Sequence, residues 1–544
     1  MSIAIVPTRA FADQRPGTAG LRKRVAVFRQ PNYLENFVQS VFDAVPELRD
    51  GSIVVGGDGR FWNREAIRTL LCIAAANGVV RASVACGGLL STPAAAMEIR
   101  ARGATGGFLL TASHNPGGPE GDFGIKFNVA TGGQASEALC ERIHARSREI
   151  HRYKLLENAS EIELDELGQH QLGAMSVEIF DPVPAYADVL ERLFDFERIR
   201  GALRAGLRVH FDALNAVAGP YAEEILVRRL GVPATSVVHS KPLPDFGGRH
   251  PDPNPHSCAA LVALAGRADA PDLLAATDGD GDRNMIIGKG VLVSPGDSLA
   301  ILVANAHRIP GYANGLKGVA RSMPTSRAVD RVAAKLGIPC YETPAGWRFF
   351  CNLLEAGRIS LCGEESFGTS SDHAREKDGL WAVLFWLDLL AATKLSVREL
   401  LERHWAEFGR DYFMREDWQV PDANLGKSVL DSAIAALPTL AGREFGALVV
   451  ESADSFAYTD PVDGSVSRNQ GLRVLFVGGA RGVLRASGTD TSGVTLRFYF
   501  DRLAAPGADH GLLPAQALAE VAVAMHELTR VRELTGLVGP RLVV

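Results

Sequence analysis

The sequence predicts an α/β protein of several domains, followed by an α+β domain at its C-terminal end. Three segments share one order: a strand-like run, a loop with glycine or polar residues, and an amphipathic helix. They are residues 52–78, 206–231 and 315–337. Residues 406–544 instead show alternating strand patterns with turn signals and then a closing helix, which is typical of an α+β domain.

The helix of the first segment shows its pattern most clearly. Ile67, Leu70, Leu71 and Ala74 fall at i, i+3, i+4 and i+7, the spacing of one buried helix face. A glycine follows each of the three predicted helices, at 78, 231 and 337, where it suits the left-handed conformation past a helix end. The repetition indicates three related α/β domains with mixed sheets.

Length sets the number of domains. At about 100–200 residues per domain, 544 residues make three to five domains with clefts between them. Proline-containing junctions near 181–184 and 308–311, and the end of an apolar helical region near 405, divide the chain. The predicted domains are 1–182, 183–308, 309–405 and 406–544.

Composition excludes several classes of protein. Hydrophobic residues at 47% and charged residues at 22% are ordinary for a globular chain. The net charge of −6 argues against a nucleic-acid partner. The seven cysteines lack the spacing of a zinc site, so we expect reduced thiols in the core. The N-terminus lacks the apolar core of about 7–15 residues that a signal peptide needs. No run approaches the ~20 apolar residues of a membrane helix, so we expect a cytoplasmic protein without membrane contact.

The stretch 111–118, TASHNPGG, predicts a reactive hydroxyl. Ser113 follows an apolar strand and precedes a proline and two glycines, so we expect its hydroxyl to project from a loop tip. His114 supplies a titratable partner and Lys126 a fixed positive charge. A solvated serine–histidine turn is the alternative.

The stretch 278–284, DGDGDRN, predicts a metal site. Asp278, Asp280 and Asp282 alternate with glycines between two apolar strands, and alternate residues of an extended segment point to one face. Three carboxylates that close repel one another unless a cation lies among them, and hard oxygen ligands suit Mg²⁺. An EF-hand loop is excluded because Arg283 and Lys289 stand where it needs glycine and glutamate. A solvated acidic turn is the alternative.

Two further loops carry polar side chains. In 361–380, Glu364 and Ser366 suit the vicinal hydroxyls of a sugar, and Lys377 suits an anion. In 485–499, hydroxyls, glycine-freed backbone N–H groups and the arginines Arg485 and Arg497 suit a phosphate that does not react. The loop is not a Walker A motif, so no nucleotide is implied.

Together and in this order, these motifs resemble the α-D-phosphohexomutase superfamily, and within it the phosphoglucomutase branch. The resemblance spans nearly the whole chain and includes PGTAGLRKRV, FDALNAVAGPY, GRHPDPNP, RSMPTS and ETPAGWRFF besides the four loops. It implies four domains around a central cleft, with one loop from each domain. The sugar loop reads GEESFG, whereas relatives acting on phosphomannose or phosphoglucosamine tend to carry GEMSGH or GEQSGH, so glucose is favoured.

The resemblance also implies the site. It implies that Ser113 carries a phosphoryl group and that Asp278, Asp280 and Asp282 bind Mg²⁺ together with a phosphate oxygen on Ser113. The remaining residues fall into three groups: the cations and acid–base candidates Arg22, His114, Lys126, Arg283 and Lys377; the sugar contacts Gly346, Glu364, Ser366 and Lys377; and the distal phosphate site of Arg485, Ser487, Gly488, Thr489 and Arg497. The general base stays open among His114, Lys126 and Lys377.

The implied activity is the interconversion of glucose 1-phosphate and glucose 6-phosphate, with glucose 1,6-bisphosphate as intermediate and activator. We expect small-molecule sugar phosphates as the only partners and a monomer or weak dimer. Three alternatives stay open: a mutase for mannose or glucosamine phosphates, a catalytically silent scaffold, and a metal-assisted serine phosphatase.

Three positions depart from the pattern of the superfamily. Ala345 replaces a threonine that would contact substrate, which should cost about 0.5–1.5 kcal/mol of binding. Asp490 replaces a glycine in the phosphate loop, and we expect its carboxylate to point away from phosphate. Arg249 replaces a histidine in GRHPDPNP, and the sequence gives it no role.

Overall fold

The computed structural model describes residues 2–17, 19–487 and 493–544. Its first domain is built on a mixed sheet with the order β2-β6-β5-β3-β4-β9-β8. The strands of this sheet are β2 Leu21–Arg24, β3 Ser52–Gly57, β4 Arg81–Leu89, β5 Gly106–Leu110, β6 Asp122–Val129, β8 Gly168–Leu172 and β9 Met175–Phe180. The main helices around it are α2 Tyr33–Ala44, α3 Asn63–Ala76, α4 Thr92–Ala101 and α5 Glu137–Glu149. β1 Ser2–Pro7 and β7 Arg152–Glu157 form a separate antiparallel ribbon.

The second and third domains are smaller versions of the same design. The second sheet has the order β11-β10-β12-β13-β14, and the third has the order β16-β15-β17-β18. The strands of the second are β10 Val209–Asp212, β11 Val237–Val238, β12 Leu273–Thr277, β13 Asn284–Gly288 and β14 Val291–Leu292. Those of the third are β15 Val319–Ser322, β16 Cys340–Thr343, β17 Leu361–Glu364 and β18 Gly368–Ser371.

The three domains repeat one strand arrangement. In each, a central strand (β3, β10 or β15) has a parallel neighbour on both sides, and one of these neighbours continues into an antiparallel partner. The predicted units at 52, 206 and 315 contain these central strands, and the predicted face of α3 is buried. Gly78, Gly231 and Gly337 all have positive φ, as expected past a helix end.

Each predicted loop of these three domains lies at the same place in its domain, between the parallel neighbour of the central strand and the antiparallel strand that follows it. The Ser113 loop joins β5 to β6, the aspartate loop joins β12 to β13, and the Glu364 loop joins β17 to β18. Three chemically different loops therefore occupy one structural position in three copies of a fold.

A continuous core joins the second and third domains. Helix α13 (Gly379–Thr393) begins at Asp378, whose side chain accepts a hydrogen bond from the backbone N–H of Trp381, and nearly all of the helix is buried. It packs against α7 (Phe196–Arg204), β12, β13 and β18. Helix α10 (Pro295–Asn305) packs against α11 (Ala328–Leu336) and β17. The sheets that carry the aspartate loop and the Glu364 loop are thus held in a fixed relation to each other.

The C-terminal domain is an antiparallel sheet with helices, as the sequence predicts. Its strand order is β20-β21-β24-β25-β26-β19-β27. The strands are β19 Arg410–Val420, β20 Glu444–Phe445, β21 Leu448–Ser455, β24 Leu472–Phe476, β25 Arg481–Ser487, β26 Val494–Ala504 and β27 Leu542–Val543. The helices are α15 Ala423–Ala436, α16 Pro514–Thr529 and α17 Val531–Thr535.

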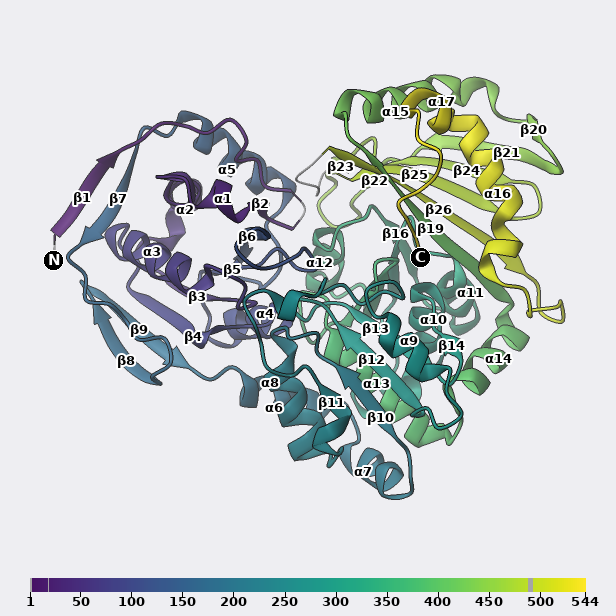
Figure 1. The fold of residues 1–544 in the computed structure, drawn as a ribbon, viewed down its shortest axis with the longest axis horizontal. Coiled ribbons are helices and arrows are strands. Elements are labelled where there is room, and N and C mark those ends of the chain that lie inside the picture. The colour runs from purple at the N-terminus through teal and green to yellow at the C-terminus, as the bar shows by residue number, and fades with distance from the viewer. Residues whose placement is uncertain (1, 18, 488–492) are drawn as a thin grey trace.

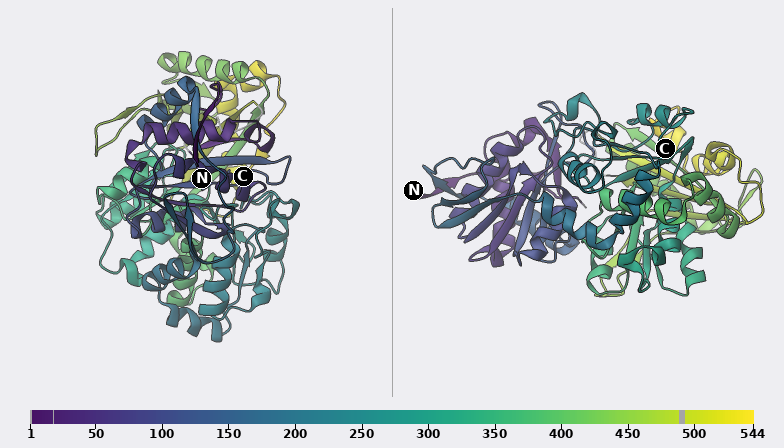
Figure 2. Two further views of the ribbon diagram at one scale, coloured as in Figure 1. Left: turned by 90° about the vertical axis from the view of Figure 1, so that its left-hand side faces the viewer. Right: turned by 90° about the horizontal axis from the view of Figure 1, so that it is seen from below.

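Figure 1 shows the arrangement of the domains. The N-terminal domain lies at the left, the second and third domains in the lower middle, and the C-terminal domain at the upper right. Figure 2 gives two further views: in the right-hand one the purple N-terminal domain again stands at one end of the molecule, and in the left-hand one it faces the viewer. A cavity of about 670 Å³ is lined by residues from all four parts of the chain, which agrees with the predicted central cleft.

Two expectations from the sequence concern the cysteines and membrane-spanning helices. All seven cysteines are free, but only Cys140, Cys258, Cys351 and Cys362 are buried; Cys340 is exposed, so the prediction of core thiols is wrong for that residue. Within the described residues, no single helix has both the length and the apolar character to cross a membrane. Helices α13 and α14 (Val397–Phe408) meet that test only as a pair, and they are bent by 84°.

Candidate functional site

The Ser113 loop is held by its own backbone contacts. Ser113 has a φ of 52°, in the left-handed region that non-glycine residues seldom adopt. Its N–H donates to the Thr111 hydroxyl at 2.8 Å, and its carbonyl accepts from Arg60 Nη2 at 2.8 Å. These contacts hold the unusual conformation in place.

A buried ion pair between Asp58 and Arg60 also holds the Ser113 loop, and sequence analysis did not identify it. Arg60 Nη2 lies 2.8 Å from Asp58 Oδ2, and neither side chain is exposed. Asp58 also accepts from the Thr111 hydroxyl at 2.6 Å, and Arg60 donates to the Asp122 carbonyl at 2.7 Å. The pair follows β3, the central strand of the repeat, and this position is the one signal that could have revealed it.

The expectation of an exposed hydroxyl is wrong. Ser113 is only 2% exposed, because the aspartate loop lies directly over it. Its Oγ donates to Asp278 Oδ2 at 2.8 Å and lies 3.4 Å from His114 Nδ1. The next residue, His114, lines the cleft, so Ser113 lies directly behind that lining. We call the buried groups behind the lining the floor of the cleft: Ser113, the aspartate trio, Lys126, Glu376 and Lys377.

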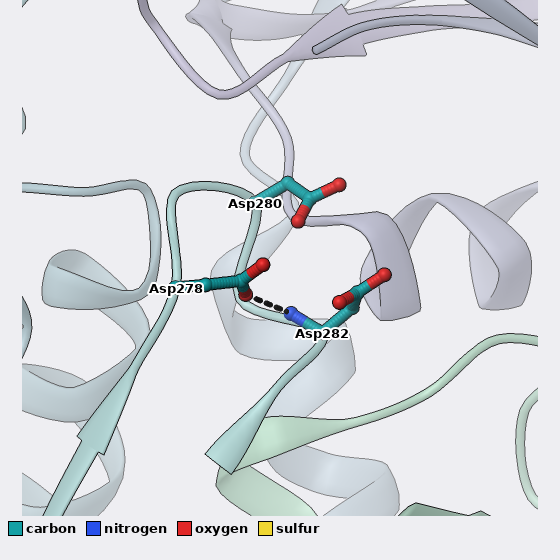
Figure 3. Close-up of side chains that lie close together, drawn as sticks. All are labelled: Asp278, Asp280 and Asp282. Carbon is teal, nitrogen blue, oxygen red and sulfur yellow. Dashed lines mark hydrogen bonds between the residues drawn. The ribbon is translucent and has the colours of Figure 1, made fainter. Parts of the chain in front are cut away.

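The aspartate loop is a tight turn and not the extended segment that the sequence predicts. A side chain at Gly279 would meet the Ser113 carbonyl oxygen at 2.4 Å, and Gly281 has a φ of 75°. The two glycines therefore permit the turn and its contact with Ser113. Asp278, Asp280 and Asp282 still converge: each offers a carboxylate oxygen within 4.8 Å of the others. Figure 3 shows the three carboxylates facing one another.

The donor set of this cluster fits a cation. Asp278 Oδ1 accepts from the N–H groups of Asp282 (2.9 Å) and Arg283 (3.0 Å), which fixes its orientation, and Figure 3 draws the first of these bonds. Asp280 Oδ1 and Asp282 Oδ1 are buried and accept no hydrogen bond from the described residues. Buried carboxylate oxygens need a partner, and a divalent cation would provide one.

The carboxylates also perturb one another electrostatically. Burial, followed by Asp282 and Asp280, raises the pKa of Asp278 well above its usual value. Burial, followed by Asp280, raises the pKa of Asp282 to about 6. For Asp280 burial acts in the same direction, but Lys126 and the Thr92 hydroxyl outweigh it and lower the pKa to about 2. A cation among the three would remove this repulsion.

Four predicted cations surround the cluster. Lys126 Nζ lies 4.0 Å from Asp280 Oδ2, Arg283 Nε lies 3.9 Å from Asp278 Oδ2, and Lys377 Nζ lies 3.3 Å from Asp282 Oδ2. Arg22 is near enough to Asp280 for that charge to affect its pKa, although burial is the larger effect and lowers the pKa. The structure therefore brings Arg22, Lys126, Arg283 and Lys377 together with Ser113.

The site shifts the pKa values of His114 and Lys377 in opposite directions. Burial, followed by Arg283 and Arg22, holds the pKa of His114 well below its usual value. Burial acts to lower the pKa of Lys377, but Asp282 and Glu364 outweigh it and raise the pKa. His114 is therefore neutral at pH 7 and Lys377 is charged.

Glu376 is a second residue whose role the sequence did not indicate. This carboxylate from the third domain is fully buried and accepts from Lys126 Nζ (3.4 Å), Asn128 Nδ2 (2.9 Å) and Gln134 Nε2 (2.9 Å) of the first. It ties the two domains together at Lys126.

The sugar loop lies beside these groups. Glu364 ends β17 and accepts from the Gly346 N–H at 2.8 Å, so both residues lie together as predicted. Ser366 lines the cleft. Lys377 was expected to face an anion, and its Nζ lies against two carboxylates, 3.3 Å from Asp282 Oδ2 and 3.8 Å from Glu364 Oε2.

The predicted phosphate residues are only partly gathered. Arg485 and Arg497 face each other across β25 and β26, and Arg497 lines the cleft. Arg485 instead acts on Glu365: burial would raise the pKa of Glu365, but Arg485 and the Ser322 hydroxyl outweigh it and lower the pKa. Ser487 ends β25. Gly488, Thr489 and Asp490 lie outside the described residues.

Family models match along the chain. Those described as phosphoglucomutase/phosphomannomutase α/β/α domains I, II and III match residues 13–154, 184–290 and 295–408. The model described as the C-terminal domain of phosphoglucomutase-1 matches residues 410–541. The chain belongs to the phosphoglucomutase/phosphomannomutase family.

Individual members of this family are similar over their full length. The chain is 52% identical to a phosphoglucomutase of Rhizobium radiobacter, over 95% of this chain and 96% of that one. It is 46% identical to human phosphoglucomutase-1, over 100% of both. The crystal structure of parafusin, a phosphoglucomutase from Paramecium in an open form, superposes with a TM-score of 0.90 at 41% identity, covering 100% of this chain and 99% of that one.

Proposed function

We propose that the protein is a phosphoglucomutase, an isomerase that interconverts α-D-glucose 1-phosphate and glucose 6-phosphate by intramolecular phosphoryl transfer. Ser113 is its phosphoryl carrier, and glucose 1,6-bisphosphate is its intermediate and activator. The observation that carries the proposal is the 2.8 Å contact between Ser113 Oγ and Asp278. Asp278 belongs to a carboxylate trio that lies directly behind His114 and Arg283, which line a cleft formed by four domains. The full-length similarity to phosphoglucomutases supports the same activity.

The carboxylate trio suits Mg²⁺. Asp278, Asp280 and Asp282 would hold the ion, together with an oxygen on Ser113, because their free oxygens are hard ligands in a buried site. A bound Mg²⁺ supplies neutralisation of the charge on the transferring group. Lys126 and Arg283, each within 4.0 Å of the trio, and Arg22 add fixed positive charge at the same place.

The proton transfers fall to His114. In the forward direction the Ser113 Oγ–P bond breaks, a new O–P bond forms to the 6-hydroxyl of glucose 1-phosphate, and the hydroxyl proton passes to a base. His114 is neutral, lies 3.4 Å from Ser113 Oγ and lines the cleft. Lys377 is charged and lies against carboxylates, so it acts as a fixed cation. Lys126, held by Glu376, takes the same role.

The sugar and its second phosphate are held by separate groups. Glu364, Ser366 and Gly346 contact the sugar, and Arg485, Ser487, Gly488, Thr489 and Arg497 form the distal phosphate site. Because the 1- and 6-oxygens lie at opposite sides of the sugar, the bisphosphate turns over in the cleft before its other phosphate returns to Ser113. Movement of the last domain over the cleft would exclude water and so disfavour transfer of the phosphoryl group to water during this step.

We further propose that the protein is a cytoplasmic monomer or weak dimer that binds sugar phosphates and neither nucleic acid nor membranes. The net charge of −6 supports the absence of a nucleic-acid partner. The proposed domains are residues 1–182, 183–308, 309–405 and 406–544. Light scattering tests the oligomeric state.

The activity is tested with glucose 1-phosphate and Mg²⁺, with and without added glucose 1,6-bisphosphate. We expect glucose 6-phosphate to form, and the bisphosphate to raise the rate. Intact-mass analysis after incubation with the bisphosphate should show a fraction ~80 Da heavier that maps to Ser113 and is missing in Ser113→Ala. Steady release of inorganic phosphate without isomerised sugar would favour a phosphatase, and the absence of both reactions would favour a scaffold.

Substrate choice needs its own measurement. The sugar loop GEESFG predicts that kcat/KM is higher for glucose 1-phosphate than for mannose 1-phosphate or glucosamine 1-phosphate. A preference for mannose 1-phosphate would overturn the assignment of Glu364 and Ser366 to glucose.

A further inference from the structure

The end of the chain returns to the cleft. β27 pairs with β19 in the register Asp417↔Leu542, and the N–H of Arg541 donates to the Asp417 carbonyl at 2.8 Å. Val544 and Arg415 exchange two backbone hydrogen bonds of 2.9 and 2.7 Å. In Figure 1 the yellow C-terminal segment runs from α17 back to the middle of the molecule. The last four residues are therefore fixed on the edge of a sheet.

This edge places Arg541 in the cavity that holds the proposed reacting groups. Arg541 lines it together with His114, Arg283 and Arg497, and the turn of the second domain contributes Arg249 and His250. Burial is the main effect that lowers the pKa of His250; Asp252 opposes it, and Arg283 and Arg541 lower it further. The guanidinium of Arg541 thus lies within electrostatic reach of the second domain.

Arg541 differs from its cationic neighbours in its charge balance. Arg283 Nη1 lies 3.5 Å from Asp252, Arg415 Nε lies 3.0 Å from Asp417, and Arg497 Nε lies 3.5 Å from Asp417. In the part of the chain that the structure describes, no ion pair joins Arg541 to a carboxylate. An arginine in a cleft without a counter-charge suits an anionic ligand, and its planar fork matches a phosphate.

We propose that Arg541 holds a phosphate group of glucose 1,6-bisphosphate while the intermediate turns over in the cleft. The inference rests on the proposed mutase function and adds a residue to it. During the turn neither phosphate is in its final place, so affinity at the reacting centre and at the distal site is reduced. A cation that lines the same cavity as His114, Arg283 and Arg497 keeps the bisphosphate from leaving.

The inference predicts how much bisphosphate escapes. We compare Arg541→Ala and Arg541→Lys with Arg502→Ala, which removes a half-exposed arginine of the same sheet that does not line the cavity. Glucose 1-phosphate labelled in its phosphate is converted by phosphorylated enzyme, and free labelled bisphosphate is measured per turnover. The concentration of added bisphosphate that gives half-maximal activity is measured in parallel.

For Arg541→Ala we expect about tenfold more bisphosphate release and about a tenfold higher bisphosphate requirement, the size of one lost charge-assisted contact. The maximal rate at saturating bisphosphate should fall much less. Arg541→Lys should lie between the wild type and Arg541→Ala, and Arg502→Ala should match the wild type. If Arg541→Ala releases no more bisphosphate than the wild type, the inference is wrong. A wild-type protein that converts no glucose 1-phosphate would instead refute the proposed function.

Discussion

The floor of the cleft and its wall in the C-terminal domain differ in how their cations are paired with carboxylates. At the floor, Ser113, the aspartate trio, Lys126, Glu376 and Lys377 are all buried, and each cation has a carboxylate within 4.0 Å. At the wall, Arg497 and Arg541 face the cavity, and Asp417 is the carboxylate paired with Arg415 and Arg497. At the floor each of these cations already has a carboxylate partner before any ligand arrives, whereas the wall carries an excess of positive charge.

This difference matches two tasks. A buried centre whose cations are held in place by carboxylates costs little reorganisation when charge develops during phosphoryl transfer. An open cationic wall attracts any phosphate that reaches it and can accept a sugar in two orientations, as a mutase requires. We therefore expect substitutions at the floor to lower kcat and substitutions at the wall to raise KM.

The largest effect should come from Ser113→Ala at the floor. Without the phosphoryl carrier, kcat should fall by at least about a thousandfold, as for loss of a covalent nucleophile. Ser257→Ala, which removes another hydroxyl lining the cleft, should stay within about threefold of the wild type. If Ser113→Ala keeps activity near the wild-type level, Ser113 is not the phosphoryl carrier and the proposed role of the floor is wrong.

Glu376→Gln should have the next largest effect. The change keeps the shape of the side chain but removes the charge that holds Lys126 across the domain boundary. A hydrogen bond to a charged group contributes about 1.5–3 kcal/mol, so kcat should fall about 10- to 150-fold with little change in KM. Asp372→Asn in the same loop serves as the control. A change confined to KM would mean that Glu376 acts on substrate binding and not on the phosphoryl-transfer step.

At the wall, Arg497→Ala should raise KM for glucose 1-phosphate about tenfold with a smaller loss of kcat. Because this side of the cleft is open to solvent, salt screens the charge of Arg497. The difference in KM between the wild type and Arg497→Ala should therefore shrink as the salt concentration rises from about 0.05 to about 0.5 M. The effect of Glu376→Gln should not depend on salt in this way. Equal salt dependence of the two variants would contradict the contrast between floor and wall.

The smallest effect lies outside both regions and concerns stability. Burial, followed by Arg331, lowers the pKa of His404 to about 4. Between pH 6.5 and 4 the unfolded chain binds a proton at this histidine and the folded chain does not, so stability is lost as pH falls. From pH 7 to 5 the wild type should lose about 2 kcal/mol more than His404→Phe in urea unfolding. His151→Phe, at an exposed site, should keep the wild-type pH dependence, and an identical pH slope in His404→Phe would refute the assignment.

The sequence predicted the parts of the site that depend on local pattern. The strands around TASHNPGG and DGDGDRN and the repeat that contains β3, β10 and β15 follow from local patterns. The meeting of Ser113 with Asp278 was implied by the resemblance to the superfamily, and the structure places the two side chains 2.8 Å apart. What the sequence could not predict depends on packing between distant segments. The burial of Ser113 is caused by Gly279 lying against its carbonyl, 166 positions along the chain.

The same reason explains the missed residues. In the sequence, nothing distinguishes the missed residues from ordinary charged residues of loops and of the last segment. They are Asp58, Arg60, Glu376 and Arg541. Only the fold shows that Arg60 reaches the carbonyl of Ser113, that Glu376 reaches Lys126, and that β27 brings Arg541 to the cleft. The extended aspartate segment was wrong for a local reason, because Gly281 adopts a positive φ and turns the chain.

The central claim is that Ser113 and the three aspartates share one divalent ion. The most direct measurement is a crystal structure of the Ser113-phosphorylated protein with Mn²⁺ in place of Mg²⁺, with the ion located by its anomalous scattering. The account predicts one peak among Asp278, Asp280 and Asp282, within about 2.5 Å of a phosphate oxygen on Ser113. A peak elsewhere, or one that the Ser113 phosphate does not reach, would contradict it.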